Sequence, residues 1–239
     1  MVGRSTLADG FKKDPDYDPH SYFGGHLTKR TYEEALALHK SGDKEFKKIR
    51  QIAKNLNFSL PGGVGARKFQ WMAAQAGIVL TLDECYYYKE EWLQAFPEMV
   101  EFFQVVNWTA TTGKPFKQFV SRRLRGDIGY CDGCNTGFQG LGGDISKHAL
   151  FLVSKASYAE PASPLYRSRP QVLVHDEIIA ESPIELAHEA TMEVVRLMNL
   201  SFEQFCPDIP SRAEPTLMTR WIKEAKPRYR DGKLIAWDL

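Results

Sequence analysis

The chain has 239 residues, of which 43% are hydrophobic, so it is long enough to bury at least one substantial core and to divide into two domains. No apolar run approaches the roughly 18 residues of a membrane span, and no signal core follows Met1, which favours the cytoplasm and no membrane partner. The net charge of +1 excludes little, because basic stretches at 44–68, 114–125 and 223–233 are balanced by an acidic one at 83–101.

The N-terminal third is predicted to begin without regular structure and to continue as helices. Residues 1–30 are rich in Asp, Pro and Gly and are expected to be loop-like. A helix is predicted from Thr31, because Thr31 and Glu34 have the spacing of a capping box, and Gly42 is expected to end it. A second helix is predicted over 43–60.

The middle of the chain carries a second capping-box pattern and a lone pair of cysteines. Thr81 and Glu84 predict another helix start, and Pro97 is expected to bend or divide that helix. Cys131 and Cys134 form a C-x-x-C without a second pair or a nearby histidine. We therefore interpret them as packed or idle thiols on one helical turn, with a zinc or redox site as the less favoured alternative.

The C-terminal part is predicted to alternate between helix and hairpin. Apolar residues at helical spacing predict a helix over 130–156, and a loop is expected over 157–170. Two β-branched runs at 172–174 and 178–180 predict a hairpin with a charged bend. A further helix is predicted over 185–199.

The helix over 43–60 has one cationic and aromatic face. Arg50, Lys54 and Phe58 occupy successive i, i+4 positions, with aliphatic residues on the other side. Such a helix can bury its aliphatic side and present a guanidinium, an ammonium and a ring to a ligand with phosphates and a sugar or base. The same pattern is also typical of an ordinary amphipathic surface helix.

The bend of the predicted hairpin is a candidate metal site. His175, Asp176 and Glu177 lie between its two strands. A carboxylate at such a bend can hold Mg²⁺, which prefers one or two carboxylates together with substrate phosphates. The alternative is a polar turn whose charges face water.

Taken together, these segments resemble the polymerase domain of family A DNA polymerases, the bacterial polymerase I type. They are similar, in chain order, to the short element after motif A, to motif B, to the conserved palm helix, to motif C and to the closing segment of that family. The matching segments are Asp18-Pro19-His20, Arg50-x-x-x-Lys54-x-x-x-Phe58 followed by Gly63, Asn135-x-x-x-Gln139-Gly140-x-x-x-Asp144, Val174-His175-Asp176-Glu177, and Ile209-Pro210 through Trp221.

The resemblance implies a role for each nucleotide-site residue. His20, Arg50 and Lys54 are expected to bind the triphosphate of an incoming dNTP, and Phe58 to pack against its sugar. Lys54 and Asp176 are expected to be catalytic, with Asp176 binding the cofactor Mg²⁺.

The resemblance also implies contacts with primer–template DNA. Asn135 and Gln139 are expected to touch the minor groove, and His175 to lie near the primer terminus. DNA phosphates are expected to be contacted by Arg122, Arg123 and Arg125, although such basic runs are often only a solvated face.

Two departures from the family pattern stand out. Gly62 occupies the place of a motif B tyrosine that stacks near the templating base, which puts template-base checking in doubt. Nothing in residues 1–19 matches motif A, whose aspartate is the family's second catalytic carboxylate, and Asp9, Asp14 and Asp16 lack its context.

The expected fold is α+β, a polymerase palm with an antiparallel sheet and inserted helical fingers. Residues 1–30 are assigned to an N-terminal palm segment, 31–130 to the fingers, and 131–239 to the palm with the motif C hairpin. The expected protein is the C-terminal subunit of a split, phage-like DNA polymerase, located in the cytoplasm of a bacterial host if phage-encoded. An N-terminal polypeptide would supply motif A and the thumb. The alternatives are a non-catalytic DNA- or nucleotide-binding module and a truncated product without function.

Overall fold

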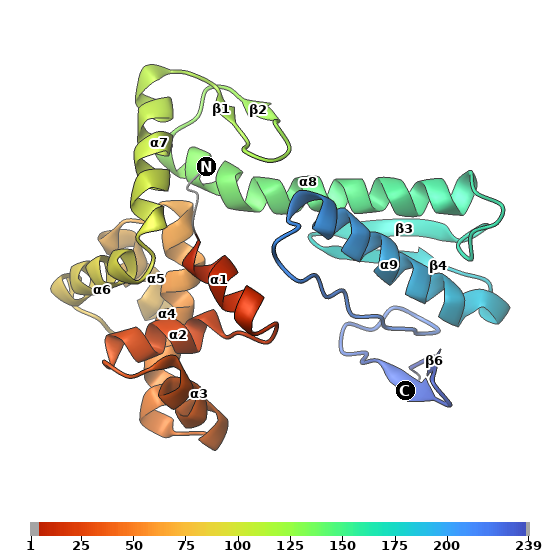
Figure 1. The fold of residues 1–239 in the computed structure, drawn as a ribbon, viewed down its shortest axis with the longest axis horizontal. Coiled ribbons are helices and arrows are strands. Elements are labelled where there is room, and N and C mark those ends of the chain that lie inside the picture. The colour runs from red at the N-terminus through yellow and green to blue at the C-terminus, as the bar shows by residue number, and fades with distance from the viewer. Residues whose placement is uncertain (1–4, 238–239) are drawn as a thin grey trace. The chain divides into compact units, whose positions relative to one another are not determined.

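The computed structural model describes residues 5–237, which fall into two compact units, one up to Gly140 and one from Leu141 onward. The colour gradient of Figure 1 follows the chain through both. The first unit is helical, with one small hairpin. Its elements are α1 (Thr6–Lys13), α2 (Pro19–Leu27), α3 (Tyr32–Ser41), α4 (Lys44–Ser59), the 3₁₀ turn η1 (Leu60–Gly62), α5 (Ala66–Gln75), α6 (Leu82–Ala95), α7 (Glu98–Thr112), β1 (Phe116–Lys117), β2 (Leu124–Arg125) and the first turns of α8 (Tyr130–Tyr158).

The expectation that residues 1–30 are loop-like is wrong for most of that segment, which contains α1 and α2. The polar residues that pointed to a loop are instead helix caps. Ser5 caps α1, and Asp18 caps α2 with Pro19 in the first turn, where a missing N–H has no cost. Residues 1–4 of the predicted N-terminal palm segment lie outside the described residues.

The predicted helix boundaries in the rest of this unit are confirmed. Both capping boxes form: Thr31 with Glu34 at the start of α3, and Thr81 with Glu84 at the start of α6. Gly42 ends α3 in a left-handed conformation with φ 76°. Pro97 separates α6 from α7, because its ring cannot continue a helix.

The core of the first unit forms where α2 and α6 pack against α4. The aliphatic side of α4 is buried as predicted, with Ile52 and Leu56 inside the core. Phe23 of α2 and Trp92 of α6 are buried in the same cluster. Burying a large apolar side chain contributes about 1.5–3 kcal/mol, so this cluster holds the cationic face of α4 in a defined position.

The second unit packs a helix and a hairpin on the later turns of α8. Its elements are β3 (Arg169–Val174), β4 (Glu177–Glu181), the 3₁₀ turn η2 (Ile184–Leu186), α9 (Ala187–Phe205), β5 (Arg228–Arg230) and β6 (Lys233–Ile235). Val153 of α8 and Leu197 of α9 are buried in one cluster, against which Ile178 of β4 packs. This arrangement supports the β3–β4 hairpin from one side (Figure 1).

The predicted helix over 130–156 and the predicted hairpin are both confirmed. Val174 pairs with Glu177, so His175 and Asp176 form a two-residue turn between β3 and β4. Within residues 5–237 the strands pair only as three separate two-stranded antiparallel sheets, and the fold is α+β as predicted. The last predicted helix is longer than expected, because α9 continues to Phe205. Across these residues no helix has the length and hydropathy that a membrane span requires.

Candidate functional site

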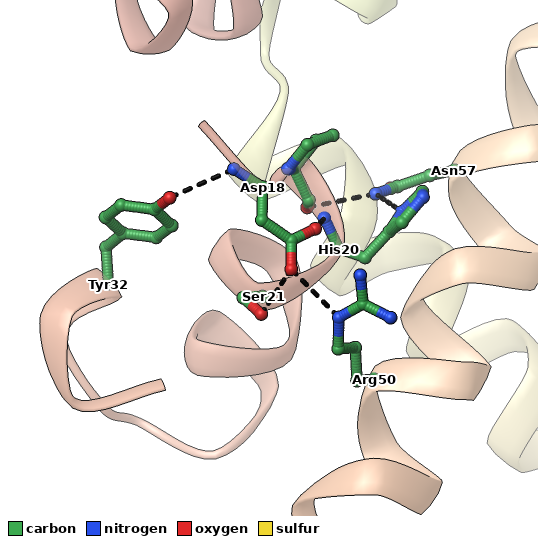
Figure 2. A network of polar contacts seen from close by, with 7 residues as sticks. Asp18, His20, Ser21, Tyr32, Arg50 and Asn57 are labelled. Atoms are coloured by element: carbon green, nitrogen blue, oxygen red, sulfur yellow. Dashed lines mark hydrogen bonds and ion pairs between the residues drawn. The ribbon is translucent and has the colours of Figure 1, made fainter. Parts of the chain in front are cut away.

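The N-terminus of α2 is tied to α4 by the carboxylate of Asp18 (Figure 2). One oxygen, Oδ1, accepts a hydrogen bond of 3.0 Å from the backbone N–H of His20. The other, Oδ2, accepts from Ser21 Oγ at 2.6 Å and from Arg50 Nε at 2.9 Å. The hydroxyl of Tyr32 accepts from the backbone N–H of Asp18 at 2.9 Å. Asp18 therefore caps one helix and holds a cation on another.

The contacts of Asp18 also determine its charge. Burial alone would raise the pKa of Asp18, but hydrogen bonds from Arg50, Ser21 and the His20 backbone lower it to about 2. Only Nε of Arg50 is held by this carboxylate. In the described part of the chain the two Nη groups donate to no partner, so they remain able to bind a further anion.

The predicted cationic and aromatic face of α4 is present. Lys54 and Phe58 are exposed, with Lys54 Nζ 5.9 Å from the ring centroid of Phe58. The His20 ring lies against Phe58 with 5.4 Å between centroids. No carboxylate of the described residues pairs with Lys54. Two cations, an imidazole and an exposed ring thus share one surface of the first unit, beside the positive end of α2.

The pKa of His20 lies below its ordinary value, which favours the neutral imidazole. Burial lowers the pKa of its imidazole, and the positive charges of Arg50 and Lys54 lower it further, while Asp18 opposes them. Asn57 Nδ2 lies 3.1 Å from His20 Nδ1 and also donates to the carbonyl oxygen of Pro19 at 3.0 Å. A neutral imidazole keeps one N–H donor, which suits a phosphate oxygen as acceptor.

The predicted DNA-contacting residues of the first unit lie at and beside the start of α8. Asn135 is half-buried against Gly62, and Gln139 is exposed one turn further along. Arg123 donates from Nη2 to the carbonyl oxygen of Gly140 at 3.2 Å, while Arg122 is exposed with φ 63°. The Arg123 side chain thus reaches α8 at Gly140, directly after the exposed Gln139.

His175 and Asp176 belong to the second unit, at the exposed turn of the β3–β4 hairpin. His175 has φ 55°, a left-handed conformation that costs a residue with a side chain roughly 1–2 kcal/mol. Glu177 is the first residue of β4 and is exposed. The turn is exposed to solvent, and the backbone pairing of β3 with β4 holds it in place.

The fit to Mg²⁺ is partial. Within residues 5–237 no group of three His, Cys, Asp or Glu side chains is placed to hold a metal ion. Asp176 can supply one exposed carboxylate, and Mg²⁺ commonly takes one or two carboxylates with substrate phosphates and water. The structure therefore shows an exposed carboxylate at this turn but no complete metal site among the described residues.

The C-x-x-C pair is packed at the first turns of α8. Cys134 is buried against Gly63, and Cys131 Sγ lies 3.6 Å from the carbonyl oxygen of Gly63. Burial raises the pKa of the Cys134 thiol to about 11, so this side chain is a neutral packing group at physiological pH.

Sequence reasoning missed the residues that support the site. Asp18 belongs to one of the matching segments, but its two roles as cap and as partner of Arg50 were not predicted; an Asp before Pro is a helix-start signal that could have indicated the first role. Asn57 and Trp92, joined by a hydrogen bond of 2.8 Å, had no such signal.

The chain is similar in sequence to DNA polymerases I. It is 24% identical over 227 residues to DNA polymerase I of Aquifex aeolicus, a match that covers 91% of this chain and 36% of that protein. It is 26% identical over 185 residues to DNA polymerase I of Helicobacter pylori, covering 73% of this chain and 19% of that protein. No family model matches the chain.

The fold has a solved counterpart. The POL domain of Pol1 from M. smegmatis, in complex with DNA primer-template and dNTP, matches with a TM-score of 0.66 at 20% identity, covering 89% of this chain and 35% of that one. The chain is thus similar in sequence to DNA polymerases I and in fold to a POL domain. The chain spans about a third of the length of the A. aeolicus protein and about a fifth of the H. pylori protein.

Proposed function

We propose that this chain is the C-terminal, nucleotide-binding part of a DNA-directed DNA polymerase that extends a primer with dNTPs. The observation that carries the proposal is the surface on which Arg50, Lys54 and His20 lie beside the exposed ring of Phe58. The similarity to DNA polymerases I supports it, as does a structural neighbour solved with primer-template and dNTP.

In this proposal the surface of α2 and α4 binds the incoming nucleotide. The Nη groups of Arg50 and the ammonium of Lys54 hold the triphosphate, and Lys54 neutralises charge that develops on the leaving pyrophosphate. His20 donates to a phosphate oxygen, and Phe58 packs against the sugar.

The remaining predicted residues would contact DNA and metal. Asn135 and Gln139 bind the primer–template, Arg122 and Arg123 its phosphates, and His175 the primer terminus. Asp176 holds Mg²⁺, which when bound lowers the barrier for attack of the primer 3′-hydroxyl on the α-phosphate.

We further propose that a separate polypeptide supplies the second metal-binding aspartate of motif A and the thumb. Residues 1–19 do not match motif A, and within residues 5–237 Asp176 belongs to no group of three His, Cys, Asp or Glu side chains that could hold a metal ion for two-metal phosphoryl transfer. Among these residues β3 and β4 pair only with each other, so the hairpin has outer edges at which a further strand can pair.

A second candidate function is a non-catalytic nucleotide- or DNA-binding module. The single carboxylate at the β3–β4 turn and Gly62 at the motif B tyrosine position favour it, because both remove parts of the catalytic apparatus while leaving the cationic surface of α4 in place.

Primer extension decides between these functions. The assay contains Mg²⁺, dNTPs and a primer–template with this chain alone, with the candidate N-terminal polypeptide alone, or with both. We expect extension only in the mixture, and its loss with Asp176→Asn. Robust extension by this chain alone contradicts the need for a partner, and absence of extension in every mixture favours the binding module.

Nucleotide binding is tested separately, since both a polymerase and a nucleotide-binding module require it. Lys54→Ala is expected to weaken dATP binding by about 1.5–3 kcal/mol, roughly 10- to 150-fold, the contribution of a hydrogen bond to a charged group. Lys48→Ala, which removes the same charge from another face of α4, is the matched control and should change affinity little. Equal affinities of the two variants in a calorimetric titration would remove Lys54 from the site.

A further inference from the structure

His20 is held by a chain of hydrogen bonds that begins in the core of the first unit. The indole Nε1–H of Trp92, a side chain that is 3% exposed, donates to Asn57 Oδ1 at 2.8 Å. Asn57 Nδ2 then reaches two groups, the carbonyl oxygen of Pro19 at 3.0 Å and Nδ1 of His20 at 3.1 Å. Three elements, α6, α4 and α2, are linked by this chain.

These hydrogen bonds allow the side-chain amide of Asn57 only one orientation. An indole nitrogen can only donate, and a carbonyl oxygen can only accept. Turning the amide by 180° would place its NH₂ group against the Trp92 N–H and its oxygen against the Pro19 oxygen. Both contacts would be repulsive, so the NH₂ group of Asn57 must face His20.

The orientation of Asn57 in turn determines where His20 carries its proton. Facing an NH₂ donor, Nδ1 of His20 must be the acceptor, and the proton of the neutral ring lies on Nε2. Nε2 has no hydrogen-bond partner in residues 5–237 and is not buried. The ring packs against Phe58, next to Lys54 and Arg50, and thus presents its free N–H donor beside the two cations.

We propose that Asn57, anchored by Trp92, is a positioning residue that fixes His20 as the Nε2–H tautomer and so provides a neutral donor for the nucleotide triphosphate. This inference rests on the proposed nucleotide-binding function, but the tautomer itself can be measured without a nucleotide. The arrangement gives the site a donor that adds no positive charge, since an imidazolium would place an Nδ1–H against the Asn57 amide.

The charged groups around His20 are consistent with a neutral ring. Arg50 and Lys54 on α4 oppose a positive charge on His20, and Asp18 at the start of α2 favours one. Because the carboxylate of Asp18 is already bonded to Arg50, Ser21 and the His20 backbone, it makes no bond to the ring. The tautomer is therefore determined by Asn57.

The deciding experiment is ¹H–¹⁵N correlation spectroscopy of the histidine ring nitrogens in the full chain at pH 7.5, with His20 assigned through His20→Gln. We expect the Nε2–H pattern in the wild-type chain. In Asn57→Asp, whose carboxylate accepts on both oxygens, we expect the proton to move to Nδ1. An Nδ1–H pattern in the wild-type chain, or an unchanged pattern in a folded Asn57→Asp chain, overturns the proposal.

Two further variants keep the test decisive. Trp92→Phe keeps the buried ring but removes the N–H, so that only Pro19 holds the amide of Asn57, and the Nδ1–H tautomer of His20 should become detectable. If Asn57→Asp does not fold, an unchanged wild-type pattern in Trp92→Phe shows that Trp92 does not anchor Asn57 and overturns the proposal. Asn55→Asp adds the same charge to α4 but its neighbour is Gln51, so it controls for electrostatic repulsion.

Binding of dATP completes the test. Asn57→Asp should bind dATP about 10-fold more weakly than Asn55→Asp, the effect of losing one hydrogen bond to a charged group. Equal affinities of these two variants overturn the role of Asn57 in nucleotide binding. No binding of dATP by the wild-type chain, with the tautomer switching as expected, instead rejects the proposed nucleotide site.

Discussion

Asp18 combines two structural roles in one side chain. It caps α2 through one oxygen and holds Arg50 of α4 through the other. A carboxylate bonded in this way is stabilised in its charged form, and the ion pair is mostly shielded from solvent, with the Asp18 side chain 14% exposed. The position of the Arg50 guanidinium, which is proposed to bind the triphosphate, thus depends on the residue that caps α2.

The low pKa of Asp18 predicts how this contact responds to pH. The pKa of about 2 in the folded chain lies below the ordinary value of about 4, so the folded state binds fewer protons. The stabilisation is present above pH 4 and is lost as the pH falls toward 2. We expect Asp18→Asn to lower the free energy of unfolding at pH 7 by roughly 1–2 kcal/mol, allowing for solvent screening.

Urea unfolding of both chains across pH 2 to 7 measures this contribution. Asparagine caps helices about as well as aspartate, so the variant isolates the pairing with Arg50 from the cap. The difference between the chains should shrink below pH 4. A difference that stays constant down to pH 2 would show that Asp18 does not stabilise the fold through its charge.

At the level of elements, the turn that follows α4 is fixed against the start of α8 by a close backbone approach. Gly63, directly after η1, has φ 78°. A Cβ atom there would lie 2.9 Å from Cys134 Sγ and 2.9 Å from Cε1 of Tyr130. A side chain at this position therefore meets both an unfavourable conformation and two packed neighbours.

Gly63→Ala is expected to destabilise the first unit by roughly 2–5 kcal/mol, the sum of left-handed backbone strain and overpacking. Gly77 is the matched control, since it has φ 76° but a Cβ atom added there would meet nothing within 4 Å, and Gly77→Ala should cost only about 1–2 kcal/mol. Thermal or urea unfolding compares the two. Similar losses in both variants would mean that α8 moves to accommodate the methyl group.

At the scale of the whole molecule, the two units have separate hydrophobic cores. The cluster around Phe23 and Leu56 belongs to the first unit, and the cluster around Val153 and Leu197 to the second. The two clusters share no residue, although the single helix α8 runs through both units. The units can therefore lose stability separately.

Leu197→Ala tests this independence. Truncating this side chain, which is 6% exposed, is expected to cost about 2–5 kcal/mol in the second unit. Native-state hydrogen exchange should then show lower protection in residues after 141 and little change in α2, α4 and α6. An equal loss of protection in both units would instead indicate one cooperative structure.

Features that depend on near neighbours in the chain could be predicted from the amino-acid sequence. The period of α4, the capping boxes at Thr31 and Thr81 and the β3–β4 hairpin are each encoded within a few residues, and all were predicted correctly. The order of motifs was equally local information and was sufficient to indicate the polymerase family.

The side chains that support the site depend instead on contacts between distant parts of the chain. Asp18 and Arg50 are 32 residues apart, and Asn57 and Trp92 are 35 residues apart. Such hydrogen bonds depend on how α2, α4 and α6 pack, and no periodicity or cap signal specifies that packing. For the same reason α2 was mistaken for a loop: its nine residues include two glycines, and burial of Phe23 rather than helix propensity stabilises it.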